Sequence, residues 1–343
     1  MSEHRFPYKW YLKDGYPESN GLNVFGTFIC GGGSTMGYKL AGFNHLGGVE
    51  IDPKIADVYK TNHKPKHLFN EDIREFNKRM DLPKELYNLD LLDGSPPCST
   101  FSMAGSREKG WGKEKVFREG QAMQTLDDLV FVYCDTIIKL QPKVFLLENV
   151  KGIIQGNAKS YSKKIVQKMT KAGYTVQVFL LNAASMGVPQ KRERVFFIGH
   201  RKELNYPKLK MEFDERAVTF GEFDEGLDTT REEITKSYMD YWLTASNGRA
   251  KTDKGNTFGY LYKTGKEETC ATILANSSTN YCHYQEPLRL TNSELCTVGT
   301  YPLDYNFKTV DPQYLIGMSV PPVMTAQIAH QIYLQWFKTE NKQ

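Results

Sequence analysis

The stretch VFGTFICGGGSTMGYKLAG, residues 24–42, decides the fold class of this chain. Apolar residues 24–29 predict a short buried strand, glycines 31–33 predict a tight turn, and Met36, Leu40 and Ala41 have helical spacing. A strand, a glycine turn and a helix begin a doubly wound α/β sheet, in which ligands bind outside the carboxyl ends of the strands. Glycines in this turn let a ligand approach the backbone and the unpaired N–H groups of the helix.

The next segment indicates a nucleoside ligand. Residues 49–52, VEID, predict the end of a second short strand that delivers a carboxylate, and an acid at this place can accept hydrogen bonds from ribose hydroxyls. The predicted first helix has no lysine placed as in a phosphate-binding P-loop. We therefore expect a nucleoside without a triphosphate.

A thiol follows a third predicted strand. Residues 89–92 read as a buried strand that ends at Asp93 or Gly94, and the stretch GSPPCSTFS, residues 94–102, places Cys98 just beyond its carboxyl end. Pro96 and Pro97 stiffen the backbone in front of this cysteine. A rigidly held thiol at a ligand crevice suggests a nucleophile, whereas an isolated cysteine is more often a small buried hydrophobic residue.

Two further polar groups are expected at the same edge of the sheet. Residues 144–147 predict a strand that delivers Glu148, and residues 176–181 and 195–198 predict two strands joined by the basic segment 187–194. If these two strands form a hairpin, Arg194 begins an antiparallel strand at the edge where Cys98 and Glu148 emerge. Each feature alone fits a solvated carboxylate or a basic loop, but together they predict three converging reactive groups.

The composition is that of an ordinary globular protein. The 343 residues are 40% hydrophobic and 24% charged, and the apolar runs are too short to span a bilayer. Six cysteines without a CxxC pair fit free thiols in a reducing cytoplasm, and their spacing predicts no metal site. The net charge of +4 permits a polyanionic partner, and residues 191–210 hold seven Lys or Arg against two Glu.

The order of these motifs resembles the C5-cytosine DNA methyltransferase family over residues 24–200 and 286–332. FICGGGSTMGYKLAGF at 28–43 resembles its cofactor-binding motif, VEID at 49–52 its ribose-binding acid, and EDI at 71–73 its adenine contact. SPPCSTFS at 95–102, ENV at 148–150 and QKRER at 190–194 resemble its three catalytic motifs, and LIGMSVPPVMTAQIAHQI at 315–332 resembles its closing motif. The chain departs from the family pattern at Cys30, Ser99 and Met318.

This resemblance implies a Rossmann-like domain that uses S-adenosyl-L-methionine, formed by residues 1–204 and 287–343, with a smaller target-recognition domain at 205–286. It implies that Cys98 is the nucleophile, that Glu148 contacts nitrogen 3 of cytosine, that Arg194 contacts the base oxygen, and that Arg192 belongs to the same catalytic set. The residues implied to line S-adenosyl-L-methionine, and S-adenosyl-L-homocysteine as the product, are Phe28, Gly31, Gly32, Gly33, Glu50, Ile51, Asp72, Ile73, Pro97, Leu129 and Ser319.

The chemistry of cytosine explains these residue types. Carbon 5 is a poor nucleophile, so a thiolate must first add to carbon 6, and a protonated Glu148 can then donate to nitrogen 3 as charge builds on the ring. A base inside a duplex cannot meet Cys98, so the target must flip out of the helix. Residues 99–120, with four glycines and several basic residues, have the composition of a mobile lid over the substrate.

The expected partner is double-stranded DNA, read by residues 205–286. Candidate DNA contacts are Gln190, Arg249, Lys251 and Asn256, because amide and basic side chains can bind base edges and phosphates. We expect a monomer in the cytoplasm, associated with the nucleoid of a bacterial or phage-infected cell and with no membrane partner. A restriction endonuclease that acts on the same sequence is a candidate partner.

Two alternatives remain open at this stage. The first is a related enzyme that methylates cytosine in structured RNA with the same motifs, although the recognition segment of about eighty residues favours DNA. The second is a non-catalytic nucleoside- or DNA-binding module in which Cys98 is only packed. Assay on both polymers separates the first alternative, and the Cys98→Ala variant separates the second.

Overall fold

The computed structural model describes residues 4–97, 114–115, 124–125, 129–227, 231–245, 248–251, 257–276 and 278–338. Their contacts divide the chain into two units. Unit 1 comprises Met1–Tyr16, Asn182–Arg192 and Glu212–Gln327, and unit 2 comprises Pro17–Leu181, Glu193–Met211 and Ile328–Gln343. The recognition domain predicted at 205–286 is defined by the residues that read DNA, and it stays a prediction.

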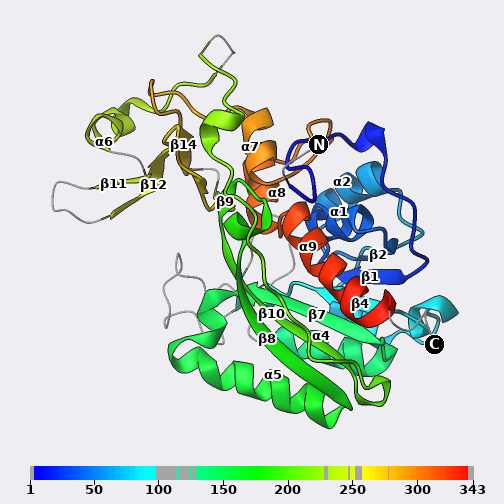
Figure 1. Ribbon diagram of the computed structural model, residues 1–343. Coiled ribbons are helices and arrows are strands. Elements are labelled where there is room, and N and C mark those ends of the chain that lie inside the picture. The colour runs from blue at the N-terminus through cyan, green and yellow to red at the C-terminus, as the bar shows by residue number, and fades with distance from the viewer. Residues whose placement is uncertain are drawn as a thin grey trace. The chain divides into compact units, whose positions relative to one another are not determined.

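Unit 2 contains the large sheet and most of the helices (Figure 1). Its strands are β1 Asn23–Thr27, β2 Asn44–Val49, β3 His67–Phe69, β4 Leu91–Gly94, β5 Glu114–Lys115, β6 Gln124–Thr125, β7 Val144–Val150, β8 Tyr174–Asn182 and β10 Glu193–Arg201. Its helices are α1 Gly33–Leu40, α2 Pro53–His63, α3 Ile73–Lys78, α4 Leu129–Leu140 and α5 Lys159–Lys171.

The large sheet has the order β3-β2-β1-β4-β7-β10-β8. Strands β3, β2, β1, β4 and β7 pair in parallel, and β10 pairs with β7 in the antiparallel sense. The order reverses between β1 and β4, so the carboxyl ends of these two strands form the switch point where doubly wound sheets bind ligands. This confirms the doubly wound α/β fold that the glycine stretch predicts.

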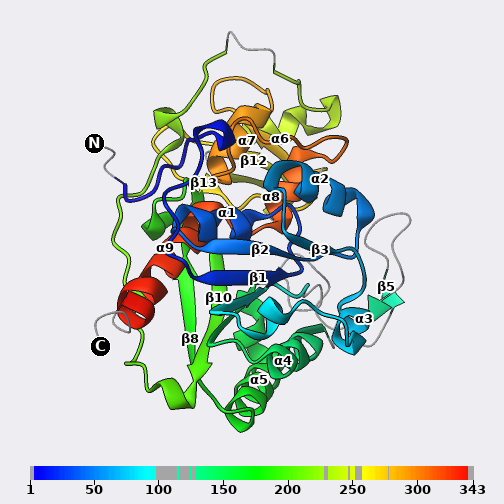
Figure 2. The same cartoon turned by 90° about the vertical axis from the view of Figure 1, so that its right-hand side faces the viewer.

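Helices cover both faces of this sheet (Figure 2). The main core, under α3, α4 and α5, includes Phe25, Phe76, Ile137, Phe145 and Ile165. Helices α1 and α2 lie on the other face. At the end of the chain a π-helical turn, Tyr333–Phe337, places the rings of Tyr333 and Phe337 against Phe43, which follows α1. These ring contacts come from the turn just beyond the closing motif, 315–332, and reach the last residue of the first motif, 28–43.

The end of the second strand differs from the sequence prediction, as do the bounds of β4, β7, β8 and β10. VEID was expected to be the end of a strand, but β2 begins at Asn44 and ends at Val49, so that Glu50 is the first residue beyond it. Gly47 and Gly48 lie inside β2, and a Cβ on Gly47 would stand 1.8 Å from the carbonyl oxygen of His67 on β3. The glycine pair, which suggests a break in a strand, is needed here because neighbouring backbones approach closely.

Unit 1 holds a smaller sheet of order β11-β12-β14 and a two-stranded pair of β13 with β9. Its elements are β9 Gln190–Lys191, α6 Met239–Thr244, β11 Gly248–Lys251, β12 Thr257–Lys263, β13 Cys270–Ala271, β14 Asn280–Cys282, α7 Asn292–Val298, α8 Pro312–Met318 and the larger part of α9 Pro322–Ile332. Trp242, Leu261 and Cys282 form a small apolar core.

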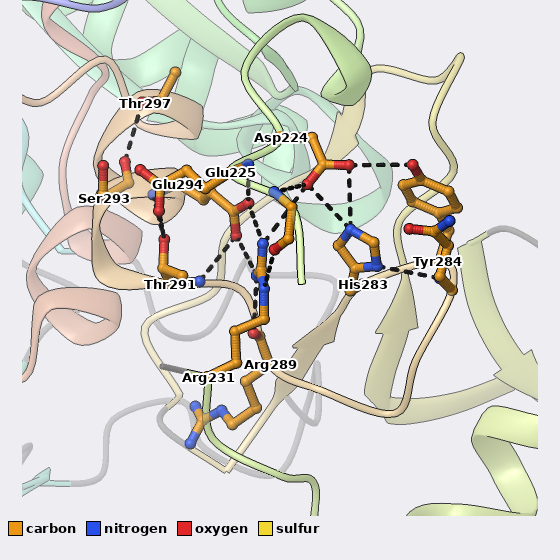
Figure 3. A network of polar contacts seen from close by, with 12 residues as sticks. Asp224, Glu225, Arg231, His283, Tyr284, Arg289, Thr291, Ser293, Glu294 and Thr297 are labelled. Atoms are coloured by element: carbon orange, nitrogen blue, oxygen red, sulfur yellow. Dashed lines mark hydrogen bonds and ion pairs between the residues drawn. The ribbon is translucent and has the colours of Figure 1, made fainter. Parts of the chain in front are cut away.

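A buried polar network lies beside this core (Figure 3). The guanidinium of Arg231 donates to both carboxylate oxygens of Glu294 at 2.7 Å, and neither side chain is exposed. Asp224 accepts from the ring of His283 at 3.1 Å and from the hydroxyl of Tyr284 at 3.1 Å. The network ties Asp224 and Arg231 to the start of α7. In the described part of the chain, no helix has the length and apolar character needed to cross a bilayer.

Candidate active site

The glycine turn after β1 has an unusual backbone. Phe28 and Cys30 have positive φ angles of 55° and 48°, and Gly32 has a φ of 79°. The ring of His63, from the end of α2, lies under this turn and bonds through Nε2 to the carbonyl oxygen of Gly31 at 3.0 Å. A Cβ on Gly32 would stand 2.3 Å from His63 Nε2, so the turn requires glycine for both its angle and its space.

Glu50 is held by the backbone on both sides. Its carboxylate accepts from the N–H of Cys30 at 3.0 Å and from the N–H of Asp52 at 2.9 Å, which connects the end of β2 to the glycine turn. Burial raises the pKa of Glu50 to about 7, although these N–H groups lower it in part. The carboxyl thus has a fixed position next to the turn, as a ribose-binding acid requires.

Three predicted cofactor residues gather in one apolar cluster. Ile73 at the start of α3 and Leu129 at the start of α4 are buried, and Phe28 and Val132 pack against them. Asp72 caps α3 and accepts from the N–H of Arg74 at 2.7 Å. An apolar cluster of this kind beside a carboxylate suits the two faces and the amino edge of an adenine ring.

These groups fit S-adenosyl-L-methionine. The fit rests on the glycine cradle that a Cβ would fill, on the fixed carboxyl of Glu50 and on the cluster of Phe28, Ile73 and Leu129. Gly31, Gly33 and Ile51 lie in the same two connections after β1 and β2.

The segment that leads to the predicted nucleophile is fixed by β7. The side-chain amide of Asn149 donates to the carbonyl oxygen of Pro96 at 3.3 Å, and its oxygen accepts from the N–H of Val150 at 2.9 Å. Pro97 follows as a partly buried residue. Cys98 and most of the predicted lid, 99–120, lie outside the described residues, except for the short strand β5. Asn149 therefore holds the chain at Pro96, two residues before Cys98 in the sequence.

Glu148 and Arg194 form an ion pair at the carboxyl edge of β7. Arg194 Nε lies 3.0 Å from Glu148 Oε1, and the two side chains are 16% and 10% exposed. The antiparallel register of β7 and β10 brings them together, because Arg194 pairs with Val150 and Phe196 pairs with Glu148. Burial lowers the pKa of Arg194, while the charge of Glu148 raises it. The expected convergence of these two groups is confirmed.

Other predicted residues lie in unit 1 and are internally bonded there. Arg192 is buried and donates to the carbonyl oxygens of Ile273 at 3.1 Å and Gly317 at 3.0 Å. Its predicted catalytic role stays a prediction. Ser319 is also buried, with its hydroxyl 2.6 Å from that of Tyr301.

The predicted DNA contacts are described only in part. Gln190 is 1% exposed, its amide donates to Val298 and its oxygen accepts from the N–H of Ile273. We expected Gln190 at a DNA surface, and the structure instead engages both ends of its amide inside unit 1. The backbone of Arg249 and Lys251 belongs to β11, while their side chains and all of Asn256 lie outside the described residues.

Three residues of the site were not singled out from the sequence. Asn149 stood inside the quoted ENV motif, and its contact with Pro96 shows why an amide follows Glu148. His63 carries no sequence signal, because its contact with the glycine turn spans 32 positions. Asp93 is 4% exposed, and an acid inside the apolar run of β4 is a signal that could have been noticed.

Comparison with known proteins identifies the family. The profile described as "C-5 cytosine-specific DNA methylase" matches residues 22–334. The Type II methyltransferase M1.HphI of Haemophilus parahaemolyticus is 27% identical over 339 residues, which cover 91% of this chain and 86% of that protein. The Type II methyltransferase M.NgoPII of Neisseria gonorrhoeae is 27% identical over 91% of this chain and 96% of its own length.

Solved structures share the fold. A protein titled a DNA modification methyltransferase, encoded within an E. coli prophage, superposes with a TM-score of 0.69 at 22% identity, over 92% of this chain and 99% of its own. A DNMT2 mutant of Spodoptera frugiperda superposes with a TM-score of 0.64 at 16% identity, over 91% of this chain and 100% of its own. The family profile matches nearly the whole chain, including Glu148 and Arg194, so this chain belongs to the C-5 cytosine-specific DNA methylases.

Proposed function

We propose that the chain transfers a methyl group from S-adenosyl-L-methionine to carbon 5 of a flipped-out cytosine in a specific double-stranded DNA sequence, through a covalent bond between Cys98 and carbon 6. The observation that carries this proposal is the ion pair of Glu148 and Arg194 at the edge to which Asn149 fixes the loop before Cys98. The family and its Type II relatives support DNA as the substrate.

The residues divide the reaction among them. The Cys98 thiolate adds to carbon 6, and Glu148 gives a proton to nitrogen 3 as electrons move to carbon 5. Arg194 cannot lose its proton under these conditions, so it holds both Glu148 and the base oxygen. The cofactor supplies the electrophilic methyl group. A base, water among the candidates, then removes the hydrogen from carbon 5, the thiolate leaves carbon 6, and the proton returns from nitrogen 3 to Glu148.

The glycine turn and Glu50 serve to bind and orient the cofactor. Glu50 would accept from the ribose hydroxyls, the N–H groups near the start of α1 would bind the methionine end, and Phe28, Ile73 and Leu129 would hold the adenine. The same proposal includes that the protein acts in the cytoplasm as a monomer and that a restriction endonuclease is its partner. The Type II names of the relatives support the endonuclease.

Covalent trapping tests the proposal. A DNA duplex with 5-fluorocytosine at the target should remain bound to the enzyme when S-adenosyl-L-methionine is present, because fluorine cannot leave as a cation after thiol addition and methyl transfer. Peptide mapping should find the base on Cys98, and Cys98→Ser should bind the duplex without forming the adduct. An adduct on another cysteine, or trapping by an RNA of the same sequence in place of DNA, would overturn it.

A further inference from the structure

Four carboxyls are buried in the described part of unit 2, and three of them bond to a cationic side chain or to backbone N–H groups. Glu148 pairs with Arg194. Glu50 accepts from two backbone N–H groups, and Asp52 caps α2 by accepting from the N–H groups of Lys54 and Ile55. The fourth is Asp93. Among the described residues, its carboxyl accepts only from two hydroxyls, that of Tyr38 at 3.1 Å and that of Ser34.

Asp93 occupies the switch point of the sheet. It is the last residue but one of β4, and it pairs across the sheet with Gly26 of β1. Its two hydroxyl partners come from α1, whose first turn follows the glycine cradle. Cys98 is five residues further along the chain. The carboxyl therefore lies where the methionine end of the cofactor and the route to the nucleophile meet.

A buried carboxylate without a cation is costly. Moving one charge from water into a protein interior costs on the order of several kcal/mol unless a partner of opposite charge compensates. Burial accordingly raises the pKa of Asp93 to about 7, the hydroxyl of Tyr38 lowers it, and the charge of Glu148 raises it further. In the ligand-free protein near pH 7, the protonated and ionised forms of Asp93 are therefore both populated. A bound cation would favour the ionised form.

The proposed reaction supplies such a cation. S-adenosyl-L-methionine carries a sulfonium and an ammonium group, and its methyl carbon must come within about 3–3.5 Å of carbon 5 for transfer. Carbon 5 is bonded to carbon 6, which Cys98 holds. Among the buried carboxyls of unit 2 in the described residues, Asp93 at the carboxyl end of β4 is the nearest in sequence to Cys98, and so to the methyl transfer.

We propose that Asp93 is a further cofactor-binding residue, whose carboxylate is the counter-charge for a cationic group of the methionine end of S-adenosyl-L-methionine. This inference rests on the proposed function. If the cation is the sulfonium, Asp93 also distinguishes substrate from product, because the sulfur of S-adenosyl-L-homocysteine is neutral. Loss of this attraction after methyl transfer would favour release of the product.

The test compares three ligands by calorimetry on the whole protein. S-adenosyl-L-methionine has both cations, S-adenosyl-L-homocysteine has only the ammonium, and 5′-methylthioadenosine has neither. Asp93→Asn keeps the shape and the acceptor for Tyr38 but removes the charge. The matched control is Asp90→Asn, which removes a carboxyl at the opposite end of the same strand, where Asp90 accepts from the N–H of Asn23 at 2.8 Å and pairs with Lys143 at 3.0 Å.

The result expected for a sulfonium contact is a roughly tenfold or larger loss of affinity of Asp93→Asn for S-adenosyl-L-methionine alone. For an ammonium contact, the losses for S-adenosyl-L-methionine and S-adenosyl-L-homocysteine are equal, and 5′-methylthioadenosine binds as before. Asp90→Asn should bind all three as the wild type does. Equal affinities of wild type and Asp93→Asn, or an equal loss for all three ligands, would overturn the proposal.

Proton release gives a second measurement. A cation that lowers the pKa of Asp93 makes the wild type release protons on binding near pH 7, which calorimetry in buffers of different ionisation heat detects, and Asp93→Asn should release fewer. The other groups facing Asp93 are Tyr38 on α1, Tyr59 on α2, Tyr133 on α4 and Glu148 on β7. Burial raises the pKa of each of these tyrosines, so they stay neutral near pH 7.

Two outcomes separate this inference from the function on which it rests. A wild-type protein that binds none of the three ligands contradicts the proposed use of S-adenosyl-L-methionine itself. A wild type that binds all three, with Asp93→Asn unchanged in affinity and in proton release, leaves that function intact and removes only the role of Asp93. Above pH 7, the midpoint temperature of thermal unfolding should be equal or higher for Asp93→Asn than for the wild type, because the variant no longer buries a charge.

Discussion

Two acidic residues of the proposed site, Glu148 and Glu50, are oriented by different kinds of neighbour. Arg194 holds one oxygen of Glu148 at 3.0 Å, which orients the carboxyl at the edge of β7. Glu50 is oriented by two backbone N–H groups, and burial raises its pKa to about 7. The ion pair fixes the direction of the Glu148 carboxyl, and the two N–H groups fix that of the Glu50 carboxyl.

Glu148→Gln should fold and bind DNA but methylate slowly. The amide oxygen can still accept from Arg194 and the amide nitrogen can still donate to nitrogen 3, but it cannot deliver a proton as charge builds on the ring. Loss of a general acid typically lowers the rate by about 10²- to 10⁴-fold. Single-turnover methylation on a target duplex measures the effect, and a normal rate would exclude the role of Glu148 as an acid.

Cofactor binding should depend on pH through Glu50. The ionised carboxylate can accept from both ribose hydroxyls, and the protonated form cannot, so affinity should rise as pH increases through about 7 and then level off. Below that value the change approaches about tenfold per pH unit. The probe is 5′-methylthioadenosine, which has the ribose but no cation for Asp93. Glu50→Gln should bind it weakly with no such slope, and a flat profile in the wild type would contradict the assignment.

At the scale of elements, the connection from β1 to α1 is the most constrained part of unit 2. Positive φ angles at Phe28, Cys30 and Gly32 turn the chain sharply, and His63 of α2 fills the space beneath it. The glycine at position 32 therefore depends on a helix that follows in the sequence. This explains how the turn keeps its shape before any ligand binds.

Gly32→Ala should weaken cofactor binding. It should also lower the free energy of unfolding by more than the cost of a positive φ angle alone. Left-handed backbone costs an L-residue about 1–2 kcal/mol, and the new Cβ would also displace His63 or the start of α1. Gly21→Ala is the matched control, since Gly21 has a φ of 81° and no atom within 4 Å of its Cβ position. Urea unfolding and calorimetry compare the two, and equal costs with intact cofactor binding would argue against the clash.

At the scale of the whole molecule, unit 1 has its own stabilising centre, the network of Figure 3. Arg231 and Glu294 are fully buried and lie 63 positions apart in the sequence. Glu294 also caps α7 by accepting from the N–H of Thr291 at 2.9 Å. The pair therefore joins the segment before α6 to the helix that follows the small sheet.

Glu294→Ala should destabilise unit 1 by about 3–5 kcal/mol, because it removes the bidentate partner of the buried Arg231 guanidinium and leaves, among the described residues, only the ion pair with Asp224 at 3.6 Å. Glu232→Ala is the control, since Glu232 is 80% exposed and its pair with Arg289 at 3.4 Å is at the surface. Such a surface pair contributes less than about 1 kcal/mol. Denaturant unfolding followed by tryptophan fluorescence measures the free energy of unfolding of both variants. Similar losses would show that the buried network stabilises unit 1 no more than a surface ion pair does.

The predicted recognition domain gives a test of specificity. Replacing residues 205–286 with the matching segment of a Type II relative should transfer the relative's target sequence, provided that an arginine remains at position 231 for Glu294, which lies outside the segment. Sequencing of the methylated sites is the measurement. A stable and active chimera that still marks the original site would place recognition elsewhere in the chain.

The sequence by itself determined the features that depend on local pattern. The strand, turn and helix at 24–42 and the doubly wound class follow from apolar spacing and glycines, which act on neighbouring residues. The same pattern placed Glu50 just after β2 and Glu148 in the last half of β7. The convergence of Glu148 and Arg194 also followed, because strand ends of known direction share an edge.

Only the tertiary structure decided which distant groups meet. The contact of His63 with Gly31, the bond from Asn149 to Pro96 and the hydroxyl surroundings of Asp93 join different elements of unit 2. Gln190 could be read as a DNA contact because its burial depends on Val298, which is 108 positions away. Such contacts arise when the apolar faces of separate elements pack together, and that packing leaves no periodic trace in the sequence near either partner.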